Sequence, residues 1–567
     1  MGRWEGRRRW FTRGPAEGVL NEPCYEAPQK NTDERAEGVI RLSAPRVRAF
    51  PADPLKHMTW YTTVVCFVVC LCPFLYVGMF AGDAEIHLVY GERAALGHFF
   101  EFNGGEKSAG VTSPGYMLLV AALFKSLPAF WVPAALKAIN LLGWYGLVLL
   151  VFLVTSRLTE NRACASLATL VAGVLPGSVY NATIGMENGL FGLFVLFWFY
   201  TAIRSGWFDS RSSLKTEVLL GGWLGMTGWI RPEGLLLGVL AVICRAMPLG
   251  RRQVCTRRMW RGSVIFLAPF IVVNFGLAIF HWRQTGVLLP ASGLSRIVLG
   301  SATWIGAVPV NGRVAQRLLL YLPLTILWVL GSWLLATGRL APKRCLRGAG
   351  FLVVMSWLYL GFYSTAFGAA HLARYLIFVM PAYVIVASLA AVWAWRTAPN
   401  AWLRATIVTA AALWLGGAFT AETVVRLRLG PSDELLRAMR APEERRAYSD
   451  QLFRDLEEPT GRRISVALQE VQIRYWLDDR FVVRSLDGRV DPVLLKYVKR
   501  GNYDHVGYLR ERGVDYVLGL AHYNRDPTAW SLERLRDLPP GASISREGVT
   551  FSRLSTNPGI YRVASTP

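Results

Sequence analysis

Long apolar runs separated by short polar connections make up most of the chain up to residue 422. A run of about 20 apolar residues can cross the hydrocarbon layer of a bilayer, which is about 30 Å thick. Ser113–Phe124 is apolar over only about a dozen residues, so we expect a re-entrant or interfacial helix there. The pattern predicts eleven transmembrane helices, at Thr59–Phe80 and at about 131–155, 163–180, 188–203, 216–231, 233–247, 263–281, 317–336, 349–368, 375–395 and 405–422.

The pattern changes on both sides of this apolar region. Beyond residue 422 charge density rises, and short β-type runs such as Ser465–Leu468, Phe481–Val483 and Tyr516–Gly519 alternate with charged helical stretches. Residues 1–56 are polar and lack the apolar core of a signal peptide, which favours a flexible cytoplasmic tail, although an over-long gene start would give the same pattern. We therefore predict a polytopic α-helical membrane protein with a tail over 1–56, a transmembrane domain over 57–422 and a soluble α/β domain over 423–567.

Composition supports the membrane assignment. Of the 567 residues 53% are hydrophobic, without counting the 53 glycines, and only 18% are charged against about 25% in soluble domains. The net charge of +23 does not indicate a nucleic-acid partner, because no clustered basic face or reading motif accompanies it. The eight cysteines lack metal-ligand spacing, so we regard them as structural or incidental.

The placement of Lys and Arg predicts the orientation of the helices. The stretch from Arg245 to Arg261 holds six arginines and no acidic residue, as cytoplasmic loops do. With the N-terminus also in the cytoplasm, an odd number of crossings places the C-terminal domain outside. The connection over 81–130 is then an outer loop.

Charged and polar side chains at the outer ends of the predicted helices indicate a functional site. Ionisable groups next to apolar spans are costly and tend to mark function. Because guanidinium binds phosphate in bidentate fashion, a lipid-linked phosphosugar would fit, with its tail in hydrocarbon and its sugar facing the carboxylates. Five outer loops contribute these residues: Asp83, Glu85, Glu187, Arg231, Glu233, His281, Arg283, Arg296, His371 and Arg374.

Structural roles are open for several of these charges. Arg231 with Glu233, or Arg374 with a nearby carboxylate, could be an ion pair that closes helix ends. Glu187 could instead interact with the macrodipole of the helix that follows it.

The histidines and the alternating carboxylates also have a simpler interpretation. His281 and His371 could be interfacial polar residues. Asp83, Glu85 and His87 alternate along a loop, which is a weak pattern for a metal site, so no metal ligand is assigned.

Several motifs occur in the order found in a known enzyme family. Residues 82–90 read Gly-Asp-Ala-Glu-Ile-His-Leu-Val-Tyr, and 102–106 and 110–114 read Phe-Asn-Gly-Gly-Glu and Gly-Val-Thr-Ser-Pro. Over about 59–395 the sequence resembles bacterial GT-C-type glycosyltransferases, in particular the polyprenyl-phosphate arabinofuranosyltransferase-like and mannosyltransferase-like group. The later motifs that carry the resemblance are Gly185-Met186-Glu187-Asn188, Arg231-Pro232-Glu233-Gly234, residues 289–296 and Arg374-Tyr375.

The resemblance implies an inverting sugar transfer from a polyprenyl-phosphate donor to an acceptor hydroxyl of a cell-envelope glycan, lipid or protein. The reaction would take place at the outer face of a bacterial cytoplasmic membrane. The resemblance implies Asp83 as the general base, with Glu85 as the alternative or its assistant. The other implied roles are donor-phosphate binding by Arg231, Arg296 and Arg374, and orientation of the sugar or these arginines by Glu187, Glu233, His87 and His371. A divalent cation stays open as a cofactor.

One departure from the family keeps two rival hypotheses open. A gapless match places Gly82 on the family's first aspartate, so only the second is kept. A catalytically inactive relative that acts as a scaffold is therefore one rival. A transporter or flippase of a lipid-linked substrate is the other, although charges gathered at one face rather than at mid-bilayer disfavour it.

Overall fold

The computed structural model describes most of the chain from residue 67 onward. Residues Leu55–Pro567 belong to one compact unit. The predicted tail over 1–56 and the start of the first predicted helix lie outside the described residues. Those residues are 67–175, 177–246, 257–288, 290, 322–337, 346–366, 377–429, 432–456, 458, 463–468, 471–486, 490–499, 502–518, 535, 538–554 and 559–565.

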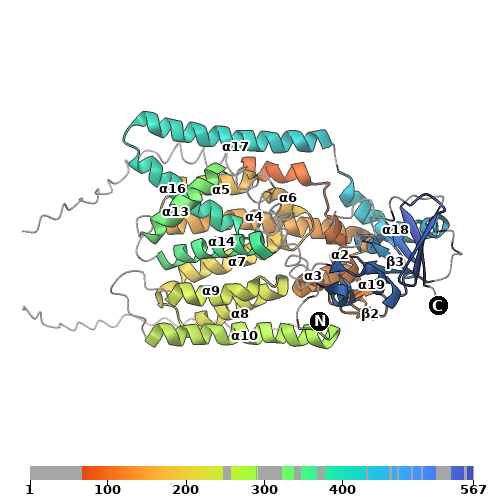
Figure 1. Ribbon diagram of the computed structural model, residues 1–567. Coiled ribbons are helices and arrows are strands. Elements are labelled where there is room, and N and C mark those ends of the chain that lie inside the picture. The colour runs from red at the N-terminus through yellow and green to blue at the C-terminus, as the bar shows by residue number, and fades with distance from the viewer. Residues whose placement is uncertain are drawn as a thin grey trace, which may run out of the picture. The chain divides into compact units, whose positions relative to one another are not determined.

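Helices form where the apolar runs predict them (Figure 1). The first run is described as a helix over Phe67–Tyr76, which ends in the 3-10 turn η1 (Cys72–Tyr76). The others are α4 (Val132–Thr159), α5 (Arg162–Val174), α6 (Ser178–Thr183), α7 (Asn188–Arg204), α8 (Leu214–Ile230), α9 (Gly234–Ala246), α10 (Arg257–Thr285), α13 (Leu322–Ala336), α14 (Leu346–Ala366), α16 (Met380–Thr397) and α17 (Ala401–Leu429).

Two described helical segments, Ala129–Thr159 and Arg257–Thr285, are long and apolar enough to cross a membrane. Six shorter apolar helices of 10–17 residues accompany them in the described part of the chain. The number of eleven crossings and their orientation stay predictions.

Helix α10 has the surface of a helix that faces an apolar solvent. Val264, Val272 and Phe275 are between 64 and 68% exposed along it. Trp260 and Trp282 are each 53% exposed and lie near its two ends, about 33 Å apart at the rise of an α-helix. Apolar residues between two interfacial tryptophans are typical of membrane proteins.

One ion pair, between Arg245 and Glu217, is buried inside the helical bundle. Arg245, the first arginine of the predicted cytoplasmic stretch, lies in the last turn of α9, and its side chain is 1% exposed. Its two terminal nitrogens donate to Glu217 of α8 at 2.7 and 2.8 Å, and the indole of Trp207 donates to the same carboxylate. Arg245 thus lies within the helix predicted over 233–247, and its buried partner offsets part of the cost of burying its charge.

The segment predicted as an outer loop over 81–130 folds into helices and a hairpin. It contains α2 (Gly82–Ala95), α3 (Pro114–Ser126), the turn η2 (Ala129–Trp131), and the antiparallel strands β1 (Glu101–Asn103) and β2 (Glu106–Lys107). The buried side of α2 shows helical spacing, at Ala84, Leu88 and Gly91, although no long apolar run predicts the helix. Helix α3 covers the short apolar run and packs against α2, where Gly91 meets Val120.

The region after α17, residues 432–565, is called the C-terminal region below. A six-stranded mixed sheet in the order β4-β3-β7-β10-β9-β8 forms its centre, with β3 parallel to β4 and β7 and the other pairs antiparallel. The three β-type runs expected from the sequence are strands β3, β4 and β7. The elements are α18 (Glu434–Asp455), β3 (Ile464–Leu468), η6 (Val471–Trp476), β4 (Phe481–Ser485), η7 (Pro492–Tyr497), β5 (Val498–Lys499), β6 (Asn502–Tyr503), α19 (His505–Glu511), β7 (Tyr516–Leu518), β8 (Ser543–Arg546), β9 (Val549–Arg553) and β10 (Ile560–Ser565).

Candidate functional site

Helix α2 presents its two predicted catalytic carboxylates on different faces. Asp83 and Glu85 are two positions apart, which corresponds to about 200° around a helix. His87 lies one turn after Asp83, on the same face, and its Nε2 is 3.0 Å from Oε2 of Glu187. Glu85 instead accepts a hydrogen bond from the indole of Trp476, with Nε1 and Oε1 3.2 Å apart. The structure therefore assigns the two carboxylates to different surroundings.

Arg231 lies between two of the predicted site carboxylates. Its Nη1 donates to Oε1 of Glu187 at 2.8 Å and also to Oδ1 of Asn188. Its Nη2 and Nε donate to the two oxygens of Glu233 at 2.7 and 3.3 Å. Arg231 is 6% and Glu187 3% exposed, so this is a buried charge network that continues through His87 to helix α2.

The two kinds of surroundings shift carboxyl pKa values in opposite directions. Burial raises the pKa of Glu187, but the Arg231 charge and the His87 hydrogen bond outweigh it and hold the pKa near 2. Burial raises the pKa of Glu85, the Trp476 hydrogen bond and the Arg437 charge offset only part of that rise, and the resulting pKa is about 7. Glu187 is thus ionised at neutral pH, whereas the Glu85 carboxyl titrates near neutral pH.

The turn before α7 brings Glu187 into this network. Gly185 has φ of +86°, and a Cβ there would clash with the Phe80 ring, so the turn requires glycine. The Gly185 carbonyl also accepts a hydrogen bond from the hydroxyl of Tyr116 at 2.7 Å. Glu187 directly precedes α7, as the macrodipole alternative requires, but its side chain makes no cap hydrogen bond and is bound by Arg231 instead.

The turn between α8 and α9 brings Arg231 and Glu233 together. The Arg231 backbone N–H donates to the Thr227 carbonyl at 2.9 Å and ends α8, and Pro232 follows. A Cβ at Gly234 would lie 2.5 Å from Oγ1 of Thr227, so the chain turns where only glycine fits. The hydroxyl of Tyr359 donates to the Glu233 carbonyl and connects this turn to α14.

The remaining predicted residues divide into two groups. Arg231 forms the ion pair with Glu233 that was the structural alternative to phosphate binding. A direct contact between Arg231 and a donor phosphate stays a prediction. Arg296, Arg374 and His371 lie outside the described residues. Among the described residues, no group of three or more His, Cys, Asp or Glu side chains is placed to hold a metal ion.

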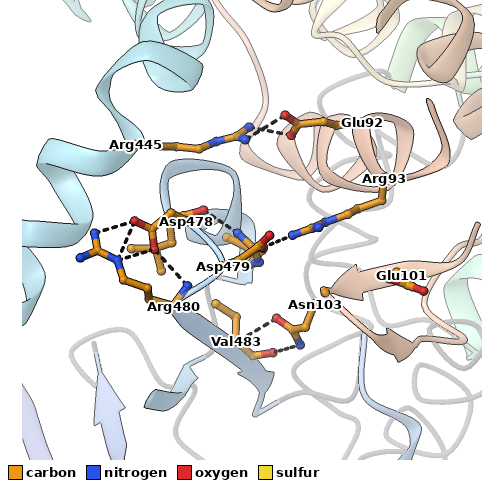
Figure 2. Close-up of polar contacts among 12 residues, drawn as sticks. Glu92, Arg93, Glu101, Asn103, Arg445, Asp478, Asp479, Arg480 and Val483 are labelled. Atoms are coloured by element: carbon orange, nitrogen blue, oxygen red, sulfur yellow. Dashed lines mark hydrogen bonds and ion pairs between the residues drawn. The ribbon is translucent and has the colours of Figure 1, made fainter. Parts of the chain in front are cut away.

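Contacts between the C-terminal region and α2 with its hairpin were not predicted (Figure 2). Arg445 donates to both oxygens of Glu92 at 2.7 and 2.9 Å, and Arg93 pairs with Asp479. The Asn103 amide exchanges two hydrogen bonds with the backbone of Val483, at 3.0 and 2.9 Å, along the edge strand β4. The partners are between 353 and 386 positions apart in the chain, and nothing local in the sequence marks them as pairs.

The fold of this chain is similar to that of solved oligosaccharyltransferase structures. The oligosaccharyltransferase of Archaeoglobus fulgidus in its apo form is similar with a TM-score of 0.54 and 11% identity, covering 82% of this chain and 69% of that one. The oligosaccharyltransferase AglB from Archaeoglobus fulgidus, in complex with an inhibitory peptide and a dolichol-phosphate, is similar with a TM-score of 0.53 and 11% identity, covering 82% of this chain and 70% of that one.

A further similar structure is ArnT from Cupriavidus metallidurans bound to undecaprenyl phosphate. Its TM-score is 0.48 at 13% identity, and the match covers 90% of this chain and 98% of ArnT. No protein-family model and no curated protein matches the sequence. At these identities the comparisons show a likeness of fold.

Proposed function

We propose that this protein is an integral-membrane glycosyltransferase of the GT-C type. It moves a sugar from a polyprenyl-phosphate donor to an acceptor hydroxyl of a cell-envelope glycan, lipid or protein. The observation that carries the proposal is the position of Asp83, one helical turn from the buried network of His87, Glu187 and Arg231, in a chain with an oligosaccharyltransferase-like fold. Three motifs shared with the GT-C group, at 82–90, 185–188 and 231–234, supply these residues.

The chemistry assigned to the site is an inverting displacement. The Asp83 carboxylate takes the proton of the acceptor hydroxyl, and that oxygen attacks the anomeric carbon of the donor sugar. The bond between that carbon and the phosphate oxygen breaks on the opposite face, and polyprenyl phosphate leaves with one additional negative charge. Arg296 and Arg374 are the cations proposed to stabilise this charge.

Arg231 has a positioning role in this proposal. Glu187 and Glu233 both accept hydrogen bonds from its guanidinium nitrogens. These bonds fix the guanidinium relative to both carboxylates. We therefore assign Arg231 to holding Glu187, which in turn holds His87 on the face of α2 that carries Asp83. Glu233 and His371 are proposed to orient the sugar or the arginines.

The proposed location is the cytoplasmic membrane of a bacterium, with the tail over 1–56 inside and the C-terminal region outside. The exposed apolar surface of α10, between Trp260 and Trp282, supports a membrane-embedded bundle. The dolichol-phosphate in the AglB complex supports a lipid-linked donor for a chain with this fold.

The test is transfer by the purified protein in lipid nanodiscs, supplied with labelled polyprenyl-phosphate sugars and a membrane extract as the acceptor. We expect labelled product from the wild type and a loss of about 10²–10⁴-fold in Asp83→Asn, which can no longer accept the proton. Asp209→Asn, in the turn η3 (Trp207–Asp209) of the helical bundle, is the matched control and should keep the wild-type rate. Equal rates in Asp83→Asn and the wild type would contradict Asp83 as the base.

The inactive scaffold is the second candidate, and Gly82 is the observation that favours it. Donor binding with no turnover in the wild type, measured by isothermal titration alongside the transfer assay, would support the scaffold. It would count against the enzyme. Movement of a fluorescent lipid-linked sugar across proteoliposomes without transfer would instead support the flippase.

A further inference from the structure

One face of α2 is covered by the C-terminal region, at the turn η6. A Cβ at Gly82 would lie 3.1–3.3 Å from three side-chain atoms of Gln472, so η6 approaches the first turn of α2 closely. One turn later on this face, Glu85 accepts the hydrogen bond from Trp476. Residues of both elements, including Ala84 and Val471, belong to one hydrophobic cluster.

The position of Trp476 is fixed from two sides. Its ring packs against Tyr448 of α18, with centroids 6.2 Å apart. The preceding carbonyl, that of Tyr475, accepts a hydrogen bond from Nε of Arg445 at 2.8 Å. The same Arg445 guanidinium bonds both carboxylate oxygens of Glu92 on α2. The indole therefore reaches Glu85 only while the C-terminal region contacts α2.

We propose that Trp476 is a positioning residue of the catalytic site, which holds the Glu85 carboxyl in place and shields it from water. The proposal rests on the proposed function, because Glu85 matters for catalysis only if Asp83 on the same helical turn is the base. It makes the C-terminal region part of the site itself. Glu85 then assists Asp83 from the opposite face of α2, and it is held in place only while η6 contacts that face.

Other charged and titratable groups face Glu85 as well. Arg437 and Glu434 approach it from α18, Tyr475 from η6, and Asp83 precedes it on α2. None of these supplies the hydrogen bond that Trp476 donates. Trp476 affects the protonation of Glu85 in two opposite ways. Its N–H favours the ionised carboxyl, and its ring favours the neutral carboxyl by excluding water.

The test compares Trp476→Phe with Trp476→Ala in the pH profile of kcat/KM between pH 5 and 9. Phenylalanine still excludes water from Glu85 but cannot donate the indole hydrogen bond. The part of the pH profile that follows the titration of Glu85, called the Glu85 limb, should therefore move up by about one pH unit. Ala admits water, so the same limb should move down toward the ordinary range of a carboxyl group. Glu85→Gln should remove this limb, and adding Trp476→Phe to it should cause no further shift.

Trp402→Phe is the matched control, since this tryptophan on α17 is 77% exposed. Its pH profile should match that of the wild type. A folding defect would lower the amount of active enzyme without moving the limb. The proposal would be overturned if the Glu85 limb of the pH profile stayed in place in both Trp476 variants, or if it shifted in the same direction in both. Asp83→Asn tests the proposed function separately, because its loss of rate does not depend on Trp476.

Discussion

Arg231 is a buried cation that binds two carboxylates, of which Glu187 is also buried. Burying an unpaired charge costs several kcal/mol, and the cost is recovered only when close partners and hydrogen bonds replace water. Here Glu187 and Glu233 are both within 2.8 Å of the guanidinium nitrogens. Such a group is stable only as a set, which makes these residues sensitive to substitution whatever their part in catalysis.

Glu187 should make stability depend on acid. Its pKa is lower in the folded protein than the ordinary value of about 4.3 in an unfolded chain. Its contribution is therefore fully present above about pH 4.3 and is lost as pH falls toward 2. Glu187→Gln should lower the free energy of unfolding at pH 7 by about 3 kcal/mol and flatten this part of the pH dependence. Urea titration in mixed micelles measures both.

The control for this prediction is Asp433→Asn. Its ion pair with Arg437 joins side chains that are 61% and 55% exposed, so its loss should cost less than about 1 kcal/mol. An equal effect of the two substitutions would contradict a special role for burial at Glu187.

At the scale of the element, α2 shows how one short helix serves two partners. Its positions 83, 87 and 91 face the bundle and α3, where His87 meets Glu187 and Gly91 meets Val120. Positions 82, 85 and 92 face the C-terminal region. The period of 3.6 residues distributes neighbouring carboxylates between these faces, so Asp83 and Glu85 acquire different surroundings although one residue separates them.

The turn before α7 should tolerate no side chain at Gly185. Gly185→Ala forces a Cβ into a positive-φ conformation and against the Phe80 ring, so we expect a loss of at least about 1–2 kcal/mol. The displaced turn should also lower transfer activity by moving Glu187. Thermal unfolding followed by tryptophan fluorescence measures the first effect.

Gly222→Ala is the comparison for Gly185→Ala. Gly222 lies within α8, and a Cβ there would meet no atom within 4 Å. Alanine at that position should leave the unfolding temperature unchanged or raise it. A similar loss at both glycines would show that the conformation of Gly185 is not the cause.

At the scale of the whole molecule, ion pairs join the C-terminal region to α2 and the hairpin. Arg445 with Glu92, Arg93 with Asp479, and Arg484 with Glu106 each bridge the two parts of the chain. Arg445 with Glu92 is the most informative pair, because Arg445 also fixes the turn that carries Trp476.

Charge reversal at this pair should undock the C-terminal region, and the swapped pair should restore it. Arg445→Glu places two acidic groups together, so protease cleavage in the C-terminal region should become faster and transfer activity should fall. Combining it with Glu92→Arg should recover part of both, because the opposite charges meet again. Failure of the double variant to differ from Arg445→Glu would mean that the pair does not contribute to docking.

Much of the bundle follows from local sequence, and much of the site does not. Apolar run length predicted most of the described helices from α4 to α17 at about their observed places, but the single segment predicted at 163–180 is two helices, α5 and α6. Helix α2 has no such run and was predicted as part of a loop. The motifs pointed to Glu187, Arg231 and Glu233 as site residues, and the structure places these three side chains in contact. Trp476 was missed because its partner Glu85 is 391 positions away and no local pattern records such a contact.

The sequence by itself determined which segments become helices, where glycine permits a tight turn and which charges are available near helix ends. These depend on residues a few positions apart. Only the tertiary structure decided that Arg231 is enclosed by two carboxylates, that Arg245 is buried, and that Glu85 faces Trp476. Protonation and ion pairing depend on distance and burial in space, and the chain order does not contain these.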